Sequence, residues 1–190
     1  RQAKEENTGQ VFSKRGKYEK DIFHSLEFIL TDAQINVLKD IRNDLARKSS
    51  MNRLIQGDVG SGKTIVAVLA ASIVISHDSQ VAIMAPTEIL AEQHYLSFLQ
   101  FCKPAQINIA LLTGSQKKAE KEKVYSDLES GEIQLVVGTH ALIQKNVNFQ
   151  NLGMIIVDEQ HRFGVEQRKA LIDKGYSPEV LALTATPIPR

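Results

Sequence analysis

The sequence is poor in the features that mark secreted and membrane-spanning proteins. It contains a single cysteine, Cys102, which rules out an internal disulfide and fits a reducing cytoplasm. We interpret this thiol as a small buried apolar side chain. The longest apolar run, TIVAVLAASIVI, is shorter than the roughly 20 residues that a membrane-spanning helix needs. The first residues lack the layout of a signal peptide. We therefore expect a cytoplasmic protein without a membrane partner.

The sequence also lacks an excess of positive charge and any clustered metal ligands. Its 23 Lys and Arg residues are balanced by 22 Asp and Glu residues, so a nucleic-acid contact has to be local. Lysines and glutamates alternate over residues 117–123, a pattern typical of a solvated helix face. His24, His77 and His94 have no neighbouring metal ligands in the sequence, so no metal-binding cluster is expected.

Short apolar runs alternate with helix-like stretches over most of the chain. This alternation predicts an α/β fold, with a mostly parallel sheet and helices on both faces. In such a sheet, ligands bind beyond the carboxyl ends of the strands. Strands are predicted at residues 53–57, 80–86, 107–114, 133–140, 153–159 and 180–186, and helices at 62–76, 87–101, 115–128 (with Gly131 as its stop) and 165–174.

The N-terminal part is predicted to differ from the rest. Residues 1–25 are polar with little periodicity, and we interpret them as a mobile lead-in or linker before a domain over residues 26–190. A helix is predicted to begin at Thr31, because Thr31 and Gln34 match a capping box ahead of apolar residues on one face. The chain starts without methionine and stops after the last predicted strand, so we expect a fragment of a longer protein.

The segment GDVGSGKT, residues 57–64, matches the complete P-loop pattern between a predicted strand and a predicted helix. Its glycines allow a tight turn whose N–H groups point at phosphate oxygens, and the following helix adds its positive dipole end. Lys63 is expected to reach the terminal phosphates, and the Thr64 hydroxyl to ligate magnesium. An ordinary glycine-rich turn is the alternative. The predicted nucleotide contacts are Gly57, Gly60, Ser61, Gly62, Lys63 and Thr64.

A pair of carboxylates follows another apolar run. Asp158 and Glu159 end the segment MIIVDE. A P-loop needs a carboxylate from a neighbouring buried strand to hold its metal ion, and we assign this role to Asp158. Glu159 is predicted to polarise the water that attacks the terminal phosphate. Without the P-loop, two acidic residues at a solvated strand end would be the preferred interpretation.

Gln34 has two compatible interpretations. As the third residue of a capping box it closes the start of a helix. As an amide ahead of the P-loop it can also pair with the donor and acceptor edge of adenine. Phe28 precedes it in LEFILTDAQ and is predicted to pack on the base. We therefore predict ATP, with magnesium, as the bound nucleotide.

Seven blocks of the sequence resemble the motifs of superfamily 2 helicases. They are FILTDAQ, GDVGSGKT, APTEILAEQH, LLTGS, VVGTHALIQ, VDEQH and LTATPIPR, which are similar in order to motifs Q, I, Ia, Ib, Ic, II and III. Finer features such as DEQHRFGVEQR resemble the RecG family, bacterial DNA helicases that remodel branched DNA in recombination and repair. The transcription-repair coupling factor is similar in these blocks, but its acidic box usually reads DEEH, so Gln160 favours the RecG family.

The resemblance implies a RecA-like P-loop domain that hydrolyses ATP together with a second motor domain. Nothing in the chain resembles motifs IV to VI or the wedge domain of RecG, so we expect the first motor domain alone, with weak or no activity in isolation. A small P-loop kinase or GTPase would give no reason for TATPIPR. A nucleotide-binding module without turnover remains an alternative for the isolated piece.

The resemblance also implies that one DNA strand follows the strand ends of the sheet. Backbone N–H groups and hydroxyls there can hold phosphates without reading bases, with ordinary loop turns as the alternative. The implied DNA contacts are Pro86, Thr87, Thr113, Gly114, Gly138, Thr139 and His140. The residues implied to link nucleotide, DNA and partner domain are Gln160, His161, Thr184 and Thr186.

The segment after the acid box adds a hypothesis of its own. Arg162 and Phe163 follow Glu159 closely and precede Gly164, on the side of the sheet where DNA should pass. Phe163 is either part of the core or an aromatic side chain exposed for stacking. We hypothesise that Arg162 and Phe163 couple DNA binding to ATP turnover.

Overall fold

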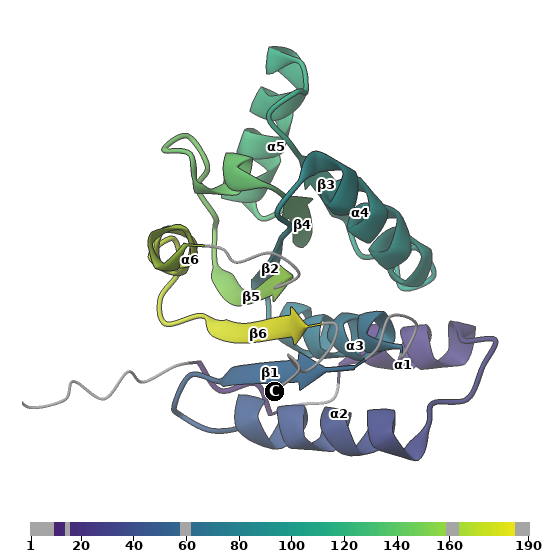
Figure 1. Ribbon diagram of the computed structural model, residues 1–190. Helices are drawn as coiled ribbons and strands as arrows, with labels where there is room; N and C mark the ends of the chain where they lie inside the picture. The colour runs from purple at the N-terminus through teal and green to yellow at the C-terminus, as the bar shows by residue number, and fades with distance from the viewer. Residues whose placement is uncertain (1–9, 14–15, 58–61, 159–163, 185–190) are drawn as a thin grey trace, which may run out of the picture.

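A six-stranded sheet forms the centre of the fold (Figure 1). The computed structural model describes residues 10–13, 16–57, 62–158 and 164–184. The strands lie in the order β1-β6-β5-β2-β4-β3, and every described pair is parallel, which confirms the predicted parallel sheet. The strands are β1 (Asn52–Gln56), β2 (Gln80–Met84), β3 (Ile109–Leu112), β4 (Leu135–Gly138), β5 (Leu152–Asp158) and β6 (Glu179–Thr184).

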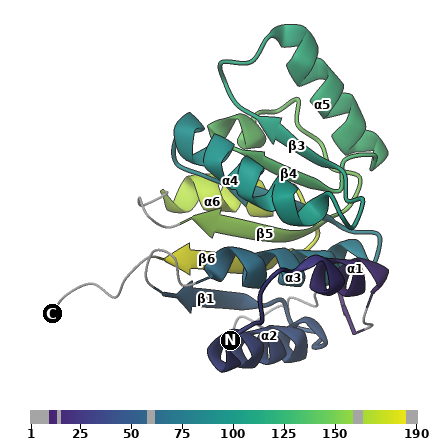
Figure 2. The ribbon, with the colours of Figure 1, turned by 90° about the vertical axis from the view of Figure 1, so that its right-hand side faces the viewer.

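Helices cover both faces of this sheet (Figures 1 and 2). On one face lie α3 (Lys63–Ile75) and α4 (Glu88–Cys102), with α1 (Lys17–Ser25) and α2 (Asp32–Leu45) packed onto α3. On the other face lie α5 (Lys118–Ser130), the 3-10 helix η1 (His140–Ile143) and α6 (Val165–Ile172). Alternate strand side chains point to opposite faces, so Val81 and Ile83 enter the first core, and Ala82 and Met84 the second.

Helix α3 is buried on all sides. Every residue from Ile65 to Ile75 is buried, because the sheet, α1, α2 and α4 surround the helix. This explains why the longest apolar run of the sequence has no polar face. Among the described residues, no helix combines the length and apolar character that crossing a membrane requires. The apolar run is therefore a core helix of the domain.

The N-terminal segment differs from the expectation. Residues 17–25, predicted to belong to a mobile lead-in, form α1, and that prediction is wrong for this part. Tyr18 and Ile22 lie one turn apart and pack on the core, with Ile22 fully buried. The buried Glu19 carboxylate forms an ion pair with Arg42 of α2. Helix α1 is therefore fixed by contacts with α2 and α3, which its own sequence does not show.

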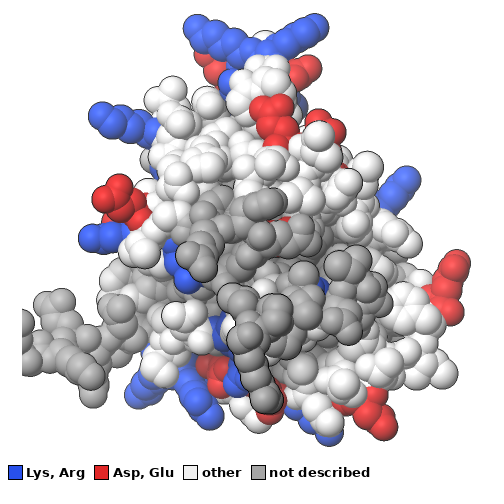
Figure 3. All heavy atoms as spheres, in the orientation of Figure 1, with Lys and Arg blue, Asp and Glu red and all other residues white. Residues whose placement is uncertain are grey.

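The other predicted helices are confirmed with small shifts in their ends. The lysine-rich helix α5 ends at Gly131, whose positive φ of 84° is the expected stop. Lys118 and Lys123 are exposed and pair with acidic residues one turn away, as in Lys123–Asp127 at 3.2 Å, whereas Lys121 donates to the Gly114 carbonyl at 2.6 Å. Figure 3 shows this mixture of Lys and acidic side chains at the tip of α5. Cys102 is buried as predicted, and burial raises the pKa of its thiol to about 12.

A buried carboxyl group lies at the amino end of β6, away from the carboxyl ends of the strands. Glu179 is fully buried. Its Oε2 atom accepts a hydrogen bond from the Met51 backbone N–H, and its Oε1 atom has no hydrogen-bond partner among the described residues. Burial, assisted by the nearby Asp44, raises the pKa of Glu179 to about 7.

Candidate nucleotide-binding and DNA-binding site

The described site residues that follow strand ends converge on one edge of the sheet, because the described strands are parallel and end there. The register pairs Gln56 of β1 with Thr184 of β6, and Leu183 of β6 with Asp158 of β5. On the other side of β5, Met84 pairs with Val157 and Gly138, and Gly138 pairs with Leu112. The P-loop, the carboxylate and the candidate DNA loops therefore follow neighbouring strand ends.

The described residues of the P-loop lie at its two ends, where it follows β1 and precedes α3. The Gly57 N–H donates to the Thr184 carbonyl at 3.3 Å. The Lys63 ammonium donates to the carbonyls of Gly57 at 2.9 Å and Thr184 at 2.8 Å, which places its charge between the ends of β1 and β6. An ammonium has three donors, and it can exchange such bonds for phosphate oxygens. Gly60 and Ser61 lie outside the described residues.

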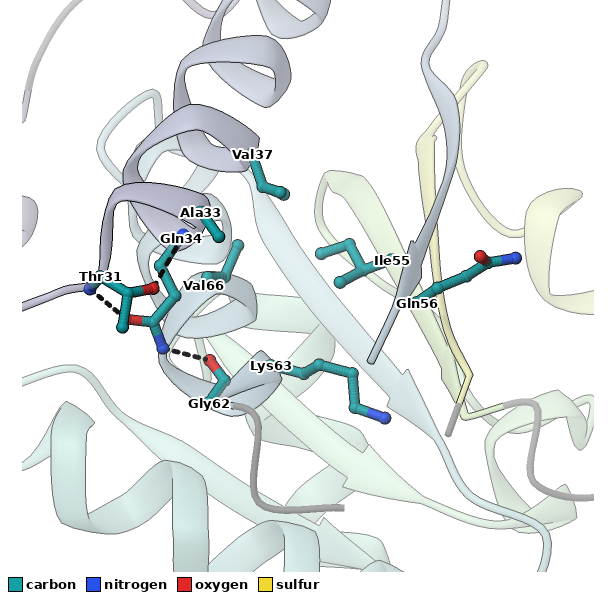
Figure 4. A pocket seen from close by; sticks show the side chains of 9 residues that line it. All are labelled: Thr31, Ala33, Gln34, Val37, Ile55, Gln56, Gly62, Lys63 and Val66. Atoms are coloured by element: carbon teal, nitrogen blue, oxygen red, sulfur yellow. Dashed lines mark hydrogen bonds between the residues drawn. The ribbon is translucent and has the colours of Figure 1, made fainter. Parts of the chain in front are cut away.

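Gln34 joins the start of α2 to the start of α3 (Figure 4). Its Oε1 atom accepts from the Thr31 N–H at 2.8 Å, and its own N–H donates to the Thr31 hydroxyl at 3.2 Å, which confirms the capping box. Its Nε2 atom donates to the Gly62 carbonyl at 3.3 Å. Gly62 has φ of 78°, and a Cβ atom there would lie 2.0 Å from Gln34 Nε2, so this approach requires glycine.

A hollow of about 140 Å³ opens beside Gln34 (Figure 4). Its apolar wall can pack on a flat base, while the Gln34 amide lies at its polar end. The hollow lies next to the described end of the P-loop, and the binding of adenine there stays a prediction. The lining residues are Thr31, Ala33, Gln34, Val37, Ile55, Gln56, Gly62, Lys63 and Val66.

Phe28, the other predicted adenine contact, lies elsewhere. Its side chain is 47% exposed and lines a separate hollow beside α4, together with Gln100 and Pro104. Phe28 does not line the hollow of Gln34. The structure therefore brings Gln34, but not Phe28, to the P-loop.

Asp158 is buried at the end of β5, where a carboxylate needs compensating partners. The Oδ2 atom of Asp158 lies 2.6 Å from the Nε2 atom of His94, which projects from α4. No sequence pattern indicates this pair, because the two residues are 64 positions apart. With the Thr64 hydroxyl in the first turn of α3, Asp158 supplies the hard oxygen ligands that magnesium prefers, so these residues fit the ion.

Six further predicted residues lie outside the described part of the chain. They are Glu159, predicted to act in hydrolysis, and the predicted coupling residues Gln160, His161, Arg162, Phe163 and Thr186. Thr184 is described and half-buried at the end of β6. Its carbonyl accepts from both Gly57 and Lys63, so it contacts the nucleotide site through its backbone.

The two candidate DNA loops after β2 and β3 are joined by one side chain. Thr87 caps α4 by accepting from the Leu90 N–H at 3.2 Å. Glu88 accepts from the Ser115 N–H at 3.0 Å and from the Ser115 hydroxyl at 2.8 Å. Thr87 and Gly114 are exposed, and Pro86 is half-buried. Glu88 therefore fixes the positions of these loops relative to each other.

The remaining candidate DNA residues are mostly buried. Thr113 is 2% exposed and Thr139 is 8% exposed. A Cβ atom on the buried Gly138 would lie 2.4 Å from the Leu112 carbonyl, so glycine is needed for close strand packing. Thr139 caps η1 by accepting from the Ala141 N–H. Among these four residues only His140 is exposed, so Thr113, Gly138 and Thr139 shape the loops but offer little side-chain surface to DNA.

Comparison with known proteins reveals close relatives. The chain is 48% identical to the ATP-dependent DNA helicase RecG of Synechocystis over 187 residues, which cover 98% of this chain and 22% of the relative. It is 53% identical to RecG of Aquifex aeolicus, covering 92% of this chain and 22% of the relative. Among solved structures, RecG bound to a three-way DNA junction matches with a TM-score of 0.86 and 46% identity, covering 98% of this chain and 25% of that one.

These likenesses confirm the RecA-like P-loop fold and favour RecG over the transcription-repair coupling factor. The chain spans about a quarter of the length of the curated relatives. The family model of the DEAD/DEAH box helicases matches residues 31–190, from the cap of α2 to the last residue. Because this match covers most of the sequence, the chain belongs to the DEAD/DEAH box helicase family.

Proposed function

We propose that this chain is the first RecA-like motor domain of a RecG-type ATP-dependent DNA helicase. The observation that carries the proposal is the meeting of Lys63, Gln34 and Asp158 at one edge of the sheet, in a chain about 50% identical to RecG. The relatives are about four times longer, which leaves room in them for a second motor domain and a wedge domain. We place the domain at residues 26–190 with α1 packed against it.

ATP binds in this proposal with its base beside Gln34 and its phosphates over the P-loop. Lys63 exchanges its bonds to Gly57 and Thr184 for the terminal phosphates. Thr64 and Asp158 would hold magnesium, which neutralises phosphate charge when bound. Glu159 orients the attacking water, and the second motor domain supplies an arginine that stabilises the transition state. Turnover therefore requires both motor domains.

The DNA side of the proposal rests on the exposed loops at the same edge. Thr87, Gly114 and His140 are exposed, and Glu88 holds two of these loops together. Because the RecG neighbour was solved on a three-way junction, we propose branched DNA as the substrate and remodelling of forks and junctions as the activity. Such a substrate places the protein in the bacterial cytoplasm.

Nucleotide binding by the 190-residue chain tests the proposal. We expect ATP and ADP to bind with magnesium, and Lys63→Ala to weaken ATP binding about tenfold or more, because a charge-assisted hydrogen bond contributes about 1.5–3 kcal/mol. Lys118→Ala, which removes an exposed charge on α5, is the matched control. Absence of binding by the unmodified chain, or equal binding by Lys63→Ala, would contradict the proposal.

A further inference from the structure

The contact between His94 and Asp158 has no role in the function described so far. The Nε2 and Oδ2 atoms are 2.6 Å apart, and the side chains are 21% and 4% exposed. An ionised carboxylate only accepts hydrogen bonds, so the Nε2 atom of His94 carries the hydrogen. A distance this short is typical of a bond to a charged partner. His94 therefore restrains the rotation of the Asp158 carboxylate.

The position of His94 on α4 makes it a rigid support. Ala91 and Phe98 lie three and four residues away on the same helix face and are fully buried. Helix α4 packs against α3, β3 and β4, so the imidazole is held by an element fixed on several sides. At its first residue the helix is also fixed by the contacts of Glu88 with Ser115.

The hydrogen bond is compatible with metal binding. A carboxylate offers about four acceptor positions, and His94 uses one of them. Residues that hydrogen-bond a metal ligand orient it, and their loss typically weakens metal affinity by about tenfold to a hundredfold. Without His94, the Oδ2 atom of Asp158 would lose this hydrogen bond at the place where the carboxylate has to face the nucleotide phosphates.

We propose that His94 is a positioning residue that orients Asp158 for magnesium in the nucleotide complex. The proposal rests on the proposed function, since it assumes that Asp158 serves the metal ion. A merely structural His94 would contribute to folding without affecting the magnesium requirement. The two roles therefore differ in one measurable quantity, the magnesium concentration needed for nucleotide binding.

The test is a magnesium titration of fluorescent ADP binding to the 190-residue chain. His94→Ala should leave ADP affinity in EDTA within about twofold of the unmodified chain and raise the half-maximal magnesium concentration about tenfold. His94→Gln, whose amide nitrogen reaches the place of Nε2, should restore most of the magnesium affinity. His94→Asn, whose amide nitrogen corresponds to Nδ1, should not. His24→Ala, an exposed histidine on α1, is the matched control.

Thermal unfolding of each variant accompanies the titration. If His94→Ala does not fold, the comparison of His94→Gln with His94→Asn decides the matter. A folded His94→Asn with an unchanged magnesium requirement overturns the positioning role while leaving the proposed function intact. Failure of the unmodified chain to bind ADP at any magnesium concentration overturns both.

Discussion

Replacing Gln34 separates its two interpretations, because the helix cap needs only the amide oxygen, whereas the pairing with adenine also needs the amide nitrogen. Gln34→Ala removes the Oε1 bond to Thr31 and the Nε2 bond to Gly62. Gln34→Glu keeps an acceptor for the Thr31 N–H, and a carboxylate is favourable in the first turn of a helix. It removes only the amide donor. The two variants therefore share the loss of the donor and differ in the cap.

The expected magnitudes follow from these bonds. Loss of a cap costs about 1 kcal/mol, which corresponds to about 3 °C in the unfolding midpoint of a domain of this size. Loss of two hydrogen bonds to adenine, at about 1 kcal/mol each, should reduce the preference of Gln34→Ala for ATP over GTP about tenfold or more. Gln34→Glu loses only the bond from the amide donor, so its preference should fall about fivefold while its helix cap is kept.

Competition binding of ATP and GTP, with thermal unfolding in parallel, gives both quantities. The ratio of the two affinities is used because the added charge of Gln34→Glu would weaken both nucleotides alike. If both variants retain the full preference for ATP, Gln34 is a helix cap alone and the assignment of the hollow to adenine fails.

Three further predictions concern other parts of the chain. Burial raises the pKa of Glu179 to about 7 from an ordinary 4.5, so the free energy of unfolding should fall by about 1–3 kcal/mol as the pH rises from about 4.5 through 7. Denaturant unfolding of Glu179→Gln should lack this dependence on pH, and the same dependence in both proteins would refute the prediction. Glu88→Ala should weaken DNA binding by the full-length helicase severalfold in a fluorescence anisotropy titration, because the Ser115 loop loses two bonds. Loss of charge alone, as in Glu92→Ala on the same helix, should raise DNA affinity instead, and a rise for Glu88→Ala would refute the loop role. Phe163→Ala should leave ATP binding unchanged and reduce DNA stimulation of the ATPase, whereas a much lower unfolding temperature would place Phe163 in the core.

The sequence predicted those features that depend on local patterns. The parallel sheet follows from alternating strands and helices, and the capping box of Thr31 and Gln34 follows from residues three positions apart. Helix α1 is not predicted from its own nine residues, because most of them are polar and the helix is held by contacts such as that of Glu19 with Arg42, 23 positions away. Isolated helices this short are marginal, so tertiary contacts decide whether they form.

For the candidate site, too, the sequence predicts the positions that follow from local patterns but not the contacts between distant segments. The described strand-end residues Gly57, Asp158 and Thr184 lie at one edge of the sheet as predicted, since parallel strands bring their carboxyl ends together. The His94–Asp158 contact was not predicted, because it joins segments 64 residues apart without any spacing signal. Nor could the sequence show that Thr113 and Thr139 are buried, since that depends on how the loops fold back on the sheet.

The measurement that tests the central claim most directly is ATP hydrolysis with and without a three-way DNA junction. It compares the 190-residue chain, the full-length helicase that we propose contains it, and the full-length Glu159→Gln variant. Without an arginine from a second motor domain, the chain alone should be about a thousandfold slower or more than the DNA-stimulated full-length protein, and Glu159→Gln should bind ATP but not turn it over. Robust DNA-stimulated hydrolysis by the 190 residues alone, or a full-length enzyme indifferent to branched DNA, would contradict the account.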